Sequence, residues 1–342
     1  MDQPASTRRP PLRDVAALAH VSEPTVSRVL NGRSGVANAT RTRVLAALAE
    51  LGYTDVPEPG RVRRGAVGIV SPELTNPVFP RLIHEIAEHL AHHGTVATVG
   101  VASTGLADEA RYLAEFADTA VDGLVLIGGS HALQPVDLEP YTRLIGEKAP
   151  LVLVNGAPVD LPVPQIRCDE ARAAERATDH LVSLGHERIG CLLGPARYHA
   201  TTRFIDGFER AAGRHGLATG PDHVAESVFT REGGRAGATR LLDRGMTAVI
   251  CGNDLMALGA VAAARAEGLS VPQDFSVVGY DGTDFTATSD PPLTTLRQPF
   301  AQMGALVADA VAAEIDGSDR FRDSYVFTPE LLARNTTGPA PR

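Results

Sequence analysis

Hydrophobic residues change their spacing near residue 66 of this 342-residue chain. Before that point, apolar residues recur at helical intervals in three short segments, at about 12–19, 24–30 and 39–51. After it, the runs predicted as buried strands are 67–70, 95–101, 122–128, 150–155, 188–193, 248–252 and 276–280. The predicted helices between them include 79–92, 108–118, 171–184, 204–214 and 255–267. Strands alternating with helices predict parallel sheets covered on both faces, and this number of strands suits two α/β subdomains better than one.

The first two helical segments have the form of a helix-turn-helix. The predicted apolar face of the first is formed by Leu12, Val15, Ala16, Leu18 and Ala19. After a tight break at 20–22, Ser22 is a suitable N-cap, and Pro24 fits the first helical turn because its missing N–H needs no partner there. Two short helices across such a turn, closed by a third helix at 39–51, predict a small DNA-binding type of domain.

The second of these helices has a polar outer face of the kind that reads a major groove. Its members are Glu23, Pro24, Thr25, Ser27, Arg28 and Asn31. Arginine bonds bidentately to guanine, and hydroxyls and amides reach bases or phosphates. Spacing alone leaves a second interpretation open, a small helical domain with a solvated polar face.

Several segments carry a family resemblance. DVAALAHVSEPTVSRVLNG, ELGY and TNPVF, followed by HLVSLGHERIGCLLGP, CGNDLMALGA, VPQDFSVVGYDG and PPLTTLRQPF, closely resemble the lactose-repressor (LacI/GalR) family of bacterial transcription regulators. The resemblance runs in order from about Leu12 to about Asn335. It implies a sequence-specific DNA-binding regulator, a repressor by preference, with an N-terminal all-α helix-turn-helix domain and an α/β core of the periplasmic-binding-protein type I, built from two Rossmann-like subdomains.

The resemblance also sets the expected boundaries. We expect the helix-turn-helix domain at 1–54, a linker at 55–65, the effector-binding core at 66–335 and a loose tail at 336–342. Crossovers near 162–166, 289–293 and 318–322 divide the core. Subdomain one then takes 66–163 and 291–319, and subdomain two takes 164–290 and 320–335.

The linker departs from the family pattern. Relatives form a hinge helix here and insert a leucine into the minor groove, whereas this chain has Pro57, Pro59 and Gly60 and lacks the leucine. We expect at most one helical turn from about Gly60, or an extended linker, with Arg61 on phosphate and Val62 as the nearest apolar wedge. The full set of DNA-binding candidates is Leu12, Ser22, Glu23, Pro24, Thr25, Ser27, Arg28, Asn31, Arg61 and Val62.

The charge distribution agrees with a DNA-binding head on an acidic body. The net charge of the chain is −9, but residues 1–64 contain ten arginines and six acidic residues, a local +4, which leaves −13 for the rest. No run is apolar enough to cross a membrane, and no export signal follows the basic N-terminus, so we expect a cytoplasmic protein. Cys168, Cys191 and Cys251 lack the spacing of a metal site or a disulfide framework, and we expect no metal or cofactor.

Candidate effector residues follow the predicted strands. Asn155, Asn253 and Asp281 each come directly after one, where ligands bind in open α/β sheets, and amide and carboxyl groups suit sugar hydroxyls. Such residues also make turns or cap helices. Aromatic candidates for stacking on a ring are Phe79, Phe229 and Phe300, although phenylalanine is more often a core residue.

The resemblance places the family's effector contacts on these six positions. It also reveals two departures: the family's clamping arginine falls on Phe204, with Arg203 one residue earlier, and Asn155 replaces a frequent aspartate. We therefore expect a neutral, sugar-like effector, with Arg203 as an uncertain clamp.

The expected partners are a palindromic double-stranded operator, a small carbohydrate and a second copy of the chain, because two half-sites need a two-fold reader. An alternative is a solute-binding protein of the same core fold in sugar uptake. A third is an α/β enzyme using Asp281, His186 or His199, but no catalytic pairing of residues supports it.

Overall fold

The computed structural model describes residues 11–30, 38–51, 65–102, 106–118 and 121–341. The head contains α1 (Leu12–Ala19), α2 (Glu23–Leu30) and α3 (Asn38–Glu50), which confirms the three predicted helices. His20 adopts a left-handed φ of 53° and ends α1. The buried residues of the head are Val15, Ala16, Ala19, Val26, Val29, Val44, Leu45, Ala47 and Leu48. The predicted burial of Leu18 is wrong, since its side chain is 40% exposed.

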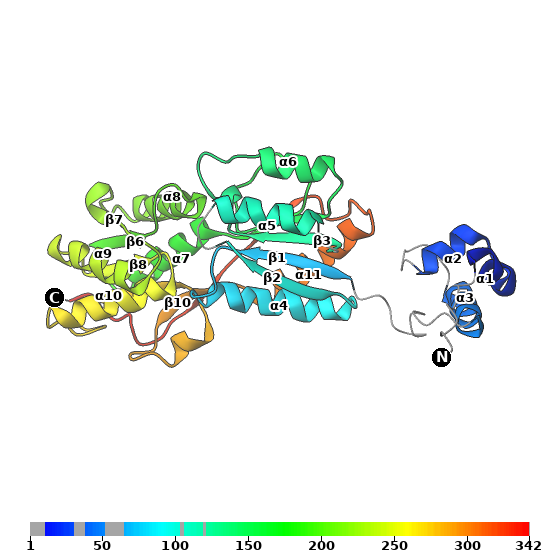
Figure 1. The fold of residues 1–342 in the computed structure, drawn as a ribbon. Helices are drawn as coiled ribbons and strands as arrows, with labels where there is room; N and C mark the ends of the chain where they lie inside the picture. The colour runs from blue at the N-terminus through cyan, green and yellow to red at the C-terminus, as the bar shows by residue number, and fades with distance from the viewer. Residues whose placement is uncertain (1–10, 31–37, 52–64, 103–105, 119–120, 342) are drawn as a thin grey trace, which may run out of the picture. The chain divides into compact units, whose positions relative to one another are not determined.

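The first lobe of the core is built on a six-stranded sheet in the order β11-β5-β4-β3-β1-β2. Its strands are β1 (Ala66–Ser71), β2 (Val96–Val101), β3 (Gly123–Ile127), β4 (Leu151–Val154), β5 (Gln165–Cys168) and β11 (Ser324–Phe327). Helices α4 (Val78–His92) and α11 (Phe300–Ile315) cover one face, and α5 (Leu106–Asp118) and α6 (Glu139–Gly146) cover the other (Figure 1). Alternation along β3 produces this arrangement, because Val125 faces α4 and α11 while Leu124 and Leu126 face α5 and α6.

The second lobe repeats the plan with the order β12-β10-β9-β8-β6-β7. Its strands are β6 (Ile189–Leu193), β7 (Val224–Glu226), β8 (Ala248–Cys251), β9 (Ser276–Asp281), β10 (Thr294–Arg297) and β12 (Glu330–Leu332). Helices α7 (Glu170–Ser183) and α8 (His199–Arg214) pack on one face, and α9 (Arg231–Asp243) and α10 (Asp254–Ala266) on the other. One hydrophobic cluster runs from the α4–α11 side of the first lobe to the α7–α8 side of the second.

All seven predicted strands and all five predicted core helices are present, although α8 begins at His199, five residues before its predicted start. The expected parallel sheets are also found, and β10–β12 is the antiparallel pair among the described registers.

The predicted crossovers are placed too early in the chain. The strand β5 pairs with β4 in the first sheet, so the chain leaves that lobe after Cys168 and not near 162–166. Likewise β10 pairs with β9 in the second sheet, and β11 pairs with β5 in the first. The second and third crossovers therefore follow Arg297 and Phe327. Short strands that contain polar residues, such as QIRC and TTLR, gave too weak an apolar signal to be recognised.

The predicted loose tail is wrong. Thr336 is fully buried, and its hydroxyl accepts a hydrogen bond from Thr294 N (2.8 Å) and donates one to Val277 O (2.7 Å). Further along, Ala340 N donates to Leu184 O at 2.9 Å. These backbone and hydroxyl bonds fasten the segment to the second lobe.

Candidate functional site

The polar face of α2 begins the candidate DNA-reading surface of the head. Ser22, Glu23 and Pro24 are exposed, whereas Thr25 and Ser27 are half-buried. The Ser22 carbonyl accepts from Thr25 N at 2.9 Å and Val26 N at 3.1 Å, and the Ser22 and Thr25 hydroxyls are 2.9 Å apart. The three exposed side chains therefore lie together at the start of α2.

The other DNA-binding candidates are less fully placed. Leu12 opens α1 and packs partly buried against the head core. Asn31, Arg61 and Val62 lie outside the described residues, as does the side chain of Arg28. The predicted behaviour of the linker also falls on residues outside the description.

In the core, buried polar atoms without partners gather at the carboxyl ends of the strands. Within the described residues, the buried side-chain atoms of this kind include Asn155 Oδ1, Arg167 Nε, Thr201 Oγ1, Arg203 Nη1, Asp281 Oδ2 and Gln298 Oε1. Buried polar groups are nearly always hydrogen-bonded, so such a group of exceptions marks a place where a ligand or water completes the bonding. We call these six residues the cleft cluster.

Two members of the cleft cluster have unusual backbones. Asn155 follows β4 with φ 55°, and Asp281 ends β9 with φ 123°. Non-glycine residues at positive φ are strained and concentrate at functional sites. Both strained residues stand at the carboxyl end of a strand.

Asp281 is a buried carboxyl group with little compensation. Gln298 Nε2 donates to Asp281 Oδ1 at 2.9 Å, and Oδ2 has no partner in the described structure. Burial, reinforced by nearby Asp254, raises the pKa of Asp281 well above its ordinary value, against the opposing effect of Gln298. Asp254 is better satisfied, since Gly282 N, Thr283 N and Thr295 Oγ1 donate to it, yet burial still raises its pKa to about 7.

An ion-paired group forms the next part of the cluster. Arg203 Nε donates to Glu170 Oε2 at 2.8 Å, and Arg203 Nη2 donates to the carbonyl of Gly156 at 3.3 Å. Arg167 Nη1 lies 3.6 Å from the same Glu170 oxygen. Glu170 thus holds both arginines, each of which retains an unpartnered buried nitrogen. The position predicted to be an uncertain clamp is therefore fixed beside Asn155.

The remaining predicted effector residues have mainly packing and capping contacts. Asn253 caps α10, because its Oδ1 accepts from Met256 N at 2.8 Å, and its Nδ2 donates to Phe229 O at 3.3 Å. Phe300 is buried in the hydrophobic core, and Phe79 is half-buried and packs against that core. Phe229 lines a hollow of about 20 Å³ with Glu170, Thr201 and Tyr280, which adjoins the cleft cluster.

A larger cavity of about 420 Å³ lies beside these residues and contains none of the seven predicted ones. Its walls come from the ends of β1 and β3, from Glu109 on α5 and from Arg197 and Tyr198 after β6. Two contacts join it to the predicted residues. Tyr198 packs edge-on against Phe229 with ring centres 5.6 Å apart, and Phe79 lies beside Gly128, which lines the cavity.

The two lobes touch along one edge of this cavity. Leu133, from the first lobe, forms an isolated antiparallel bridge with Tyr198, and Gln134 N donates to Arg197 O at 2.7 Å. The Gln134 side-chain amide also donates to Thr202 Oγ1 at 2.7 Å and lies 3.1 Å from His199 Nδ1. We call this pair of segments, 133–134 and 197–202, the strap.

The sequence interpretation missed Arg167, Glu170, Thr201, Gln298 and the whole cavity. An arginine within the buried strand QIRC is the one local signal, because an ionised side chain there needs a partner. His186 was posed as an acid–base residue, but it is buried between Thr247, Ser276 and Gly338 O, which it contacts at 2.9, 3.0 and 3.1 Å.

Among the described residues, no group of three or more His, Cys, Asp or Glu side chains is placed to hold a metal. No helix in the described part of the chain has the length and apolarity needed to span a bilayer.

Comparisons with known proteins agree with both regions. Residues 11–55 match the model for bacterial regulatory proteins of the lacI family, and residues 178–337 match a periplasmic binding protein-like domain. The chain is 43% identical over 337 residues to the HTH-type transcriptional regulator MalR of Streptomyces coelicolor, covering 96% of this chain and 97% of MalR. It belongs to the LacI family. As a LacI-family protein it is a DNA-binding transcription regulator, and the helix-turn-helix head does not favour the alternative of a solute-binding protein.

Solved structures of two transcription regulators share the fold over nearly the whole chain. The complex of the transcriptional regulator CelR with cellobiose has a TM-score of 0.72 and 30% identity, covering 96% of this chain and all of that one. The lac repressor dimer bound to operator and the anti-inducer ONPF has a TM-score of 0.71 and 27% identity, covering 97% of this chain and all of that one.

Proposed function

We propose that this LacI-family regulator is a cytoplasmic, homodimeric repressor whose operator affinity is controlled by a neutral sugar bound in the core. The observation that carries the proposal is the cleft cluster. Its unpartnered atoms are acceptors on Asn155 and Gln298, donors on Arg167 and Arg203, the Thr201 hydroxyl, which can donate and accept, and one oxygen of Asp281. A sugar hydroxyl both donates and accepts, so adjacent hydroxyls satisfy such a mixture. The cellobiose complex of CelR is a precedent for this ligand class.

The charges of the cluster are close to balance. Glu170 pairs with Arg203 and contacts Arg167, so one positive charge remains when Asp281 is its neutral acid, and the neutral ligand is proposed from the hydroxyl-like mixture of donors and acceptors. The sugar would change operator binding through unequal affinity for two arrangements of the lobes, because a ligand with equal affinity shifts no equilibrium. The proposal includes no catalytic step.

For the head, we propose that the exposed start of α2 reads bases. Glu23 and Pro24 would set base choice, and Ser22, Thr25, Ser27, Arg28 and Asn31 would add base or phosphate contacts. Leu12 at the start of α1 would offer its backbone N–H to phosphate. Arg61 would neutralise phosphate, and Val62 would be the nearest apolar candidate for a wedge in the minor groove. The lac repressor dimer on its operator supports a two-fold arrangement.

Binding-site selection from random DNA, with and without a sugar panel, tests the proposal. We expect a palindromic operator and a sugar that changes its affinity. Arg28→Ala should weaken binding by about 1–3 kcal/mol, whereas Arg143→Ala, on the exposed face of α6, should leave it unchanged. No palindromic preference under any sugar would refute the proposal. Val62→Ala should change operator affinity little. A loss of roughly tenfold or more in operator affinity, with an unchanged salt slope, would instead indicate that Val62 acts as a wedge.

A further inference from the structure

Asp254, the first residue of α10, is a buried carboxyl group that lies next to the candidate site without belonging to the cleft cluster. We infer that it is a positioning residue, which holds the turn at 281–283 and thereby fixes where Asp281 meets the ligand. Asp254 would not touch the sugar itself. This inference rests on the proposed function and concerns how the site keeps its binding geometry.

The two oxygens of Asp254 join the turn to the sheet. Oδ2 accepts hydrogen bonds from Gly282 N at 2.9 Å, from Thr283 N at 3.2 Å and from Thr283 Oγ1 at 3.3 Å. Oδ1 accepts from Thr295 Oγ1, on β10, at 2.6 Å. Because the backbone of Asp254 belongs to a helix and Thr295 to a strand, the turn is fastened to two regular elements.

The turn has a strained backbone that needs such fastening. Asp281 has φ 123° and Gly282 has φ 73°, and a Cβ on Gly282 would lie 2.4 Å from Arg297 Cα. Gln298 N donates to Asp281 O at 3.0 Å and holds the other side of the turn. Strained conformations persist only where the surroundings hold them. Without the Asp254 carboxylate, two buried N–H groups would lose their acceptor, and the turn would relax and move the Asp281 side chain.

The fold makes a dedicated space for Asp254 at a cost in stability. The side chain is 2% exposed, and a Cβ on Gly279 of β9 would lie 2.4 Å from Asp254 Oδ1. Within the described residues, the hydrogen-bond donors to Asp254 are N–H and hydroxyl groups, all of them neutral. Burying a carboxyl group without a cation is unfavourable, and such departures from good packing are expected at functional sites.

A double-mutant cycle on the full-length protein tests the inference. Glucose, galactose, ribose, cellobiose and maltose are the probes, and isothermal titration calorimetry measures their affinities. Asp254→Ala should weaken each sugar that binds the wild type by about tenfold or more, because Asp281 is displaced. In a protein that already carries Asp281→Ala, the same substitution should change the Kd less than about twofold, since Asp254 acts through Asp281.

The conservative variant should restore the position. In Asp254→Asn, the amide oxygen can accept from the turn while the amide nitrogen donates to Thr295 Oγ1, so sugar affinity should stay within about threefold. Asp274→Ala makes the matched change in the loop before β9, where the carboxylate accepts from Ser270 N, and should leave sugar affinity unchanged.

A milder variant serves if Asp254→Ala fails to fold. Thr283→Val keeps the shape of the side chain and removes the hydroxyl bond to Asp254 Oδ2. It should weaken sugar binding by about two- to fivefold in the wild type and have no effect beside Asp281→Ala.

Hydrogen exchange without any sugar gives an independent measurement. The amides of Gly282 and Thr283 should exchange about tenfold or more faster in Asp254→Ala than in the wild type, and at nearly the wild-type rate in Asp254→Asn.

The outcomes separate this inference from the proposed function. Equal weakening by Asp254→Ala with and without Asp281→Ala would refute the positioning role, because independent losses add. A loss in Asp254→Asn as large as that in Asp254→Ala would also refute it, since the position alone would not suffice. If no sugar in the panel binds, the proposed effector class fails. Faster exchange at the two amides would then still uphold the hold of Asp254 on the turn, and unchanged exchange would overturn it.

Discussion

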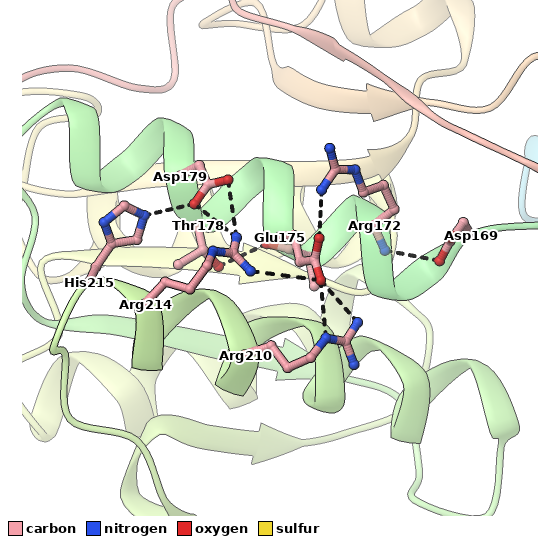
Figure 2. Close-up of polar contacts among 9 residues, drawn as sticks. Asp169, Arg172, Glu175, Thr178, Asp179, Arg210, Arg214 and His215 are labelled. Carbon is pink, nitrogen blue, oxygen red and sulfur yellow. Dashed lines mark hydrogen bonds and ion pairs between the residues drawn. The ribbon is translucent and has the colours of Figure 1, made fainter.

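Two polar clusters of the core use the same residue types in opposite ways. On the outer side of the second lobe, Glu175 of α7 receives Arg172 Nη1 at 2.7 Å and Arg210 Nη2 at 3.0 Å, with Arg214 Nη1 at 3.9 Å (Figure 2). Asp179, one turn further along α7, accepts from Arg214 Nη2 and lies 2.8 Å from His215 Nε2. In this cluster, both carboxylates have cationic partners.

The cleft cluster leaves such groups incomplete. There the carboxyl group of Asp281 has one bonded and one unpartnered oxygen, and Arg167 and Arg203 keep unpartnered nitrogens. A satisfied polar group stabilises the contact between elements, whereas an unsatisfied buried group lowers stability until a ligand completes it. The comparison therefore indicates that the Glu175 cluster holds α7 against α8, and it supports the binding role proposed for the cleft cluster.

The largest expected effect is on ligand binding at Asp281. Asp281→Ala should weaken the sugar that proves active by about 100-fold, because it removes a hydrogen-bonding group aimed at the ligand. Titration calorimetry measures the change. Asp281→Asn keeps the shape and a donor, and should retain binding within about tenfold. Equal and small losses for the two variants would show that this side chain does not touch the ligand.

The Glu175 cluster should show the opposite pattern, a loss of stability without a loss of binding. Glu175→Gln should lower the free energy of unfolding by about 1–3 kcal/mol, since Arg172 and Arg210 lose a charged acceptor. Sugar affinity should stay within about twofold. Glu209→Gln, on the exposed side of α8, is the matched control and should change stability by less than about 0.5 kcal/mol. Urea unfolding measures both variants. Equal losses in the free energy of unfolding for Glu175→Gln and Glu209→Gln would contradict this structural role.

The two clusters should also respond to pH with opposite signs. Burial alone would raise the pKa of Glu175, but its hydrogen bonds and charge interactions with Arg172 and Arg210 outweigh burial and lower it. Its stabilising contribution is therefore present above the unfolded pKa, about 4.3, and disappears as pH falls through the lower folded pKa. The deficit of Glu175→Gln should be full near neutral pH and shrink in acid.

Asp281 has the reverse dependence. Because burial and nearby Asp254 raise its pKa, the folded state is penalised as pH rises above the unfolded value of about 3.9. Asp281→Asn cannot ionise, so its stability relative to the wild type should increase between about pH 4 and neutrality. Unfolding curves at a series of pH values measure this difference, and a constant difference would mean that Asp281 is ionised in the folded protein.

The smallest expected effect is at the strap. Gln134→Ala removes the side-chain bonds to Thr202 and His199 while keeping the backbone bond to Arg197, and should weaken sugar binding by about two- to fivefold. Burial and the charge of Arg203 lower the pKa of His199, which keeps its ring neutral and able to accept from Gln134 at neutral pH. Gln273→Ala, on an exposed loop before β9, should have no effect. Identical sugar affinities for Gln134→Ala and Gln273→Ala would show that the strap does not contribute to sugar binding.

Within the candidate site, sequence reasoning worked from local signals. It selected Asn155 and Asp281 because they stand at the ends of apolar strands, and both belong to the cleft cluster. It had no such signal where a partner is distant in sequence. Glu170 accepts a hydrogen bond from Arg203, 33 residues away in the chain, and Gln298 donates one to Asp281, 17 residues away. Asn253, although it also follows a strand, serves as a helix cap.

The sequence by itself determined the alternation of strands and helices, the three helices of the head and the concentration of positive charge at 1–64, because periodicity and charge are properties of neighbouring residues. Only the tertiary structure decided where the chain crosses between sheets, that Thr336 fastens the C-terminal segment, and which buried polar atoms stay unpaired. Those features depend on hydrogen bonds between segments that meet only after folding. A residue's own neighbours in the chain do not reveal whether its polar atoms will find a partner.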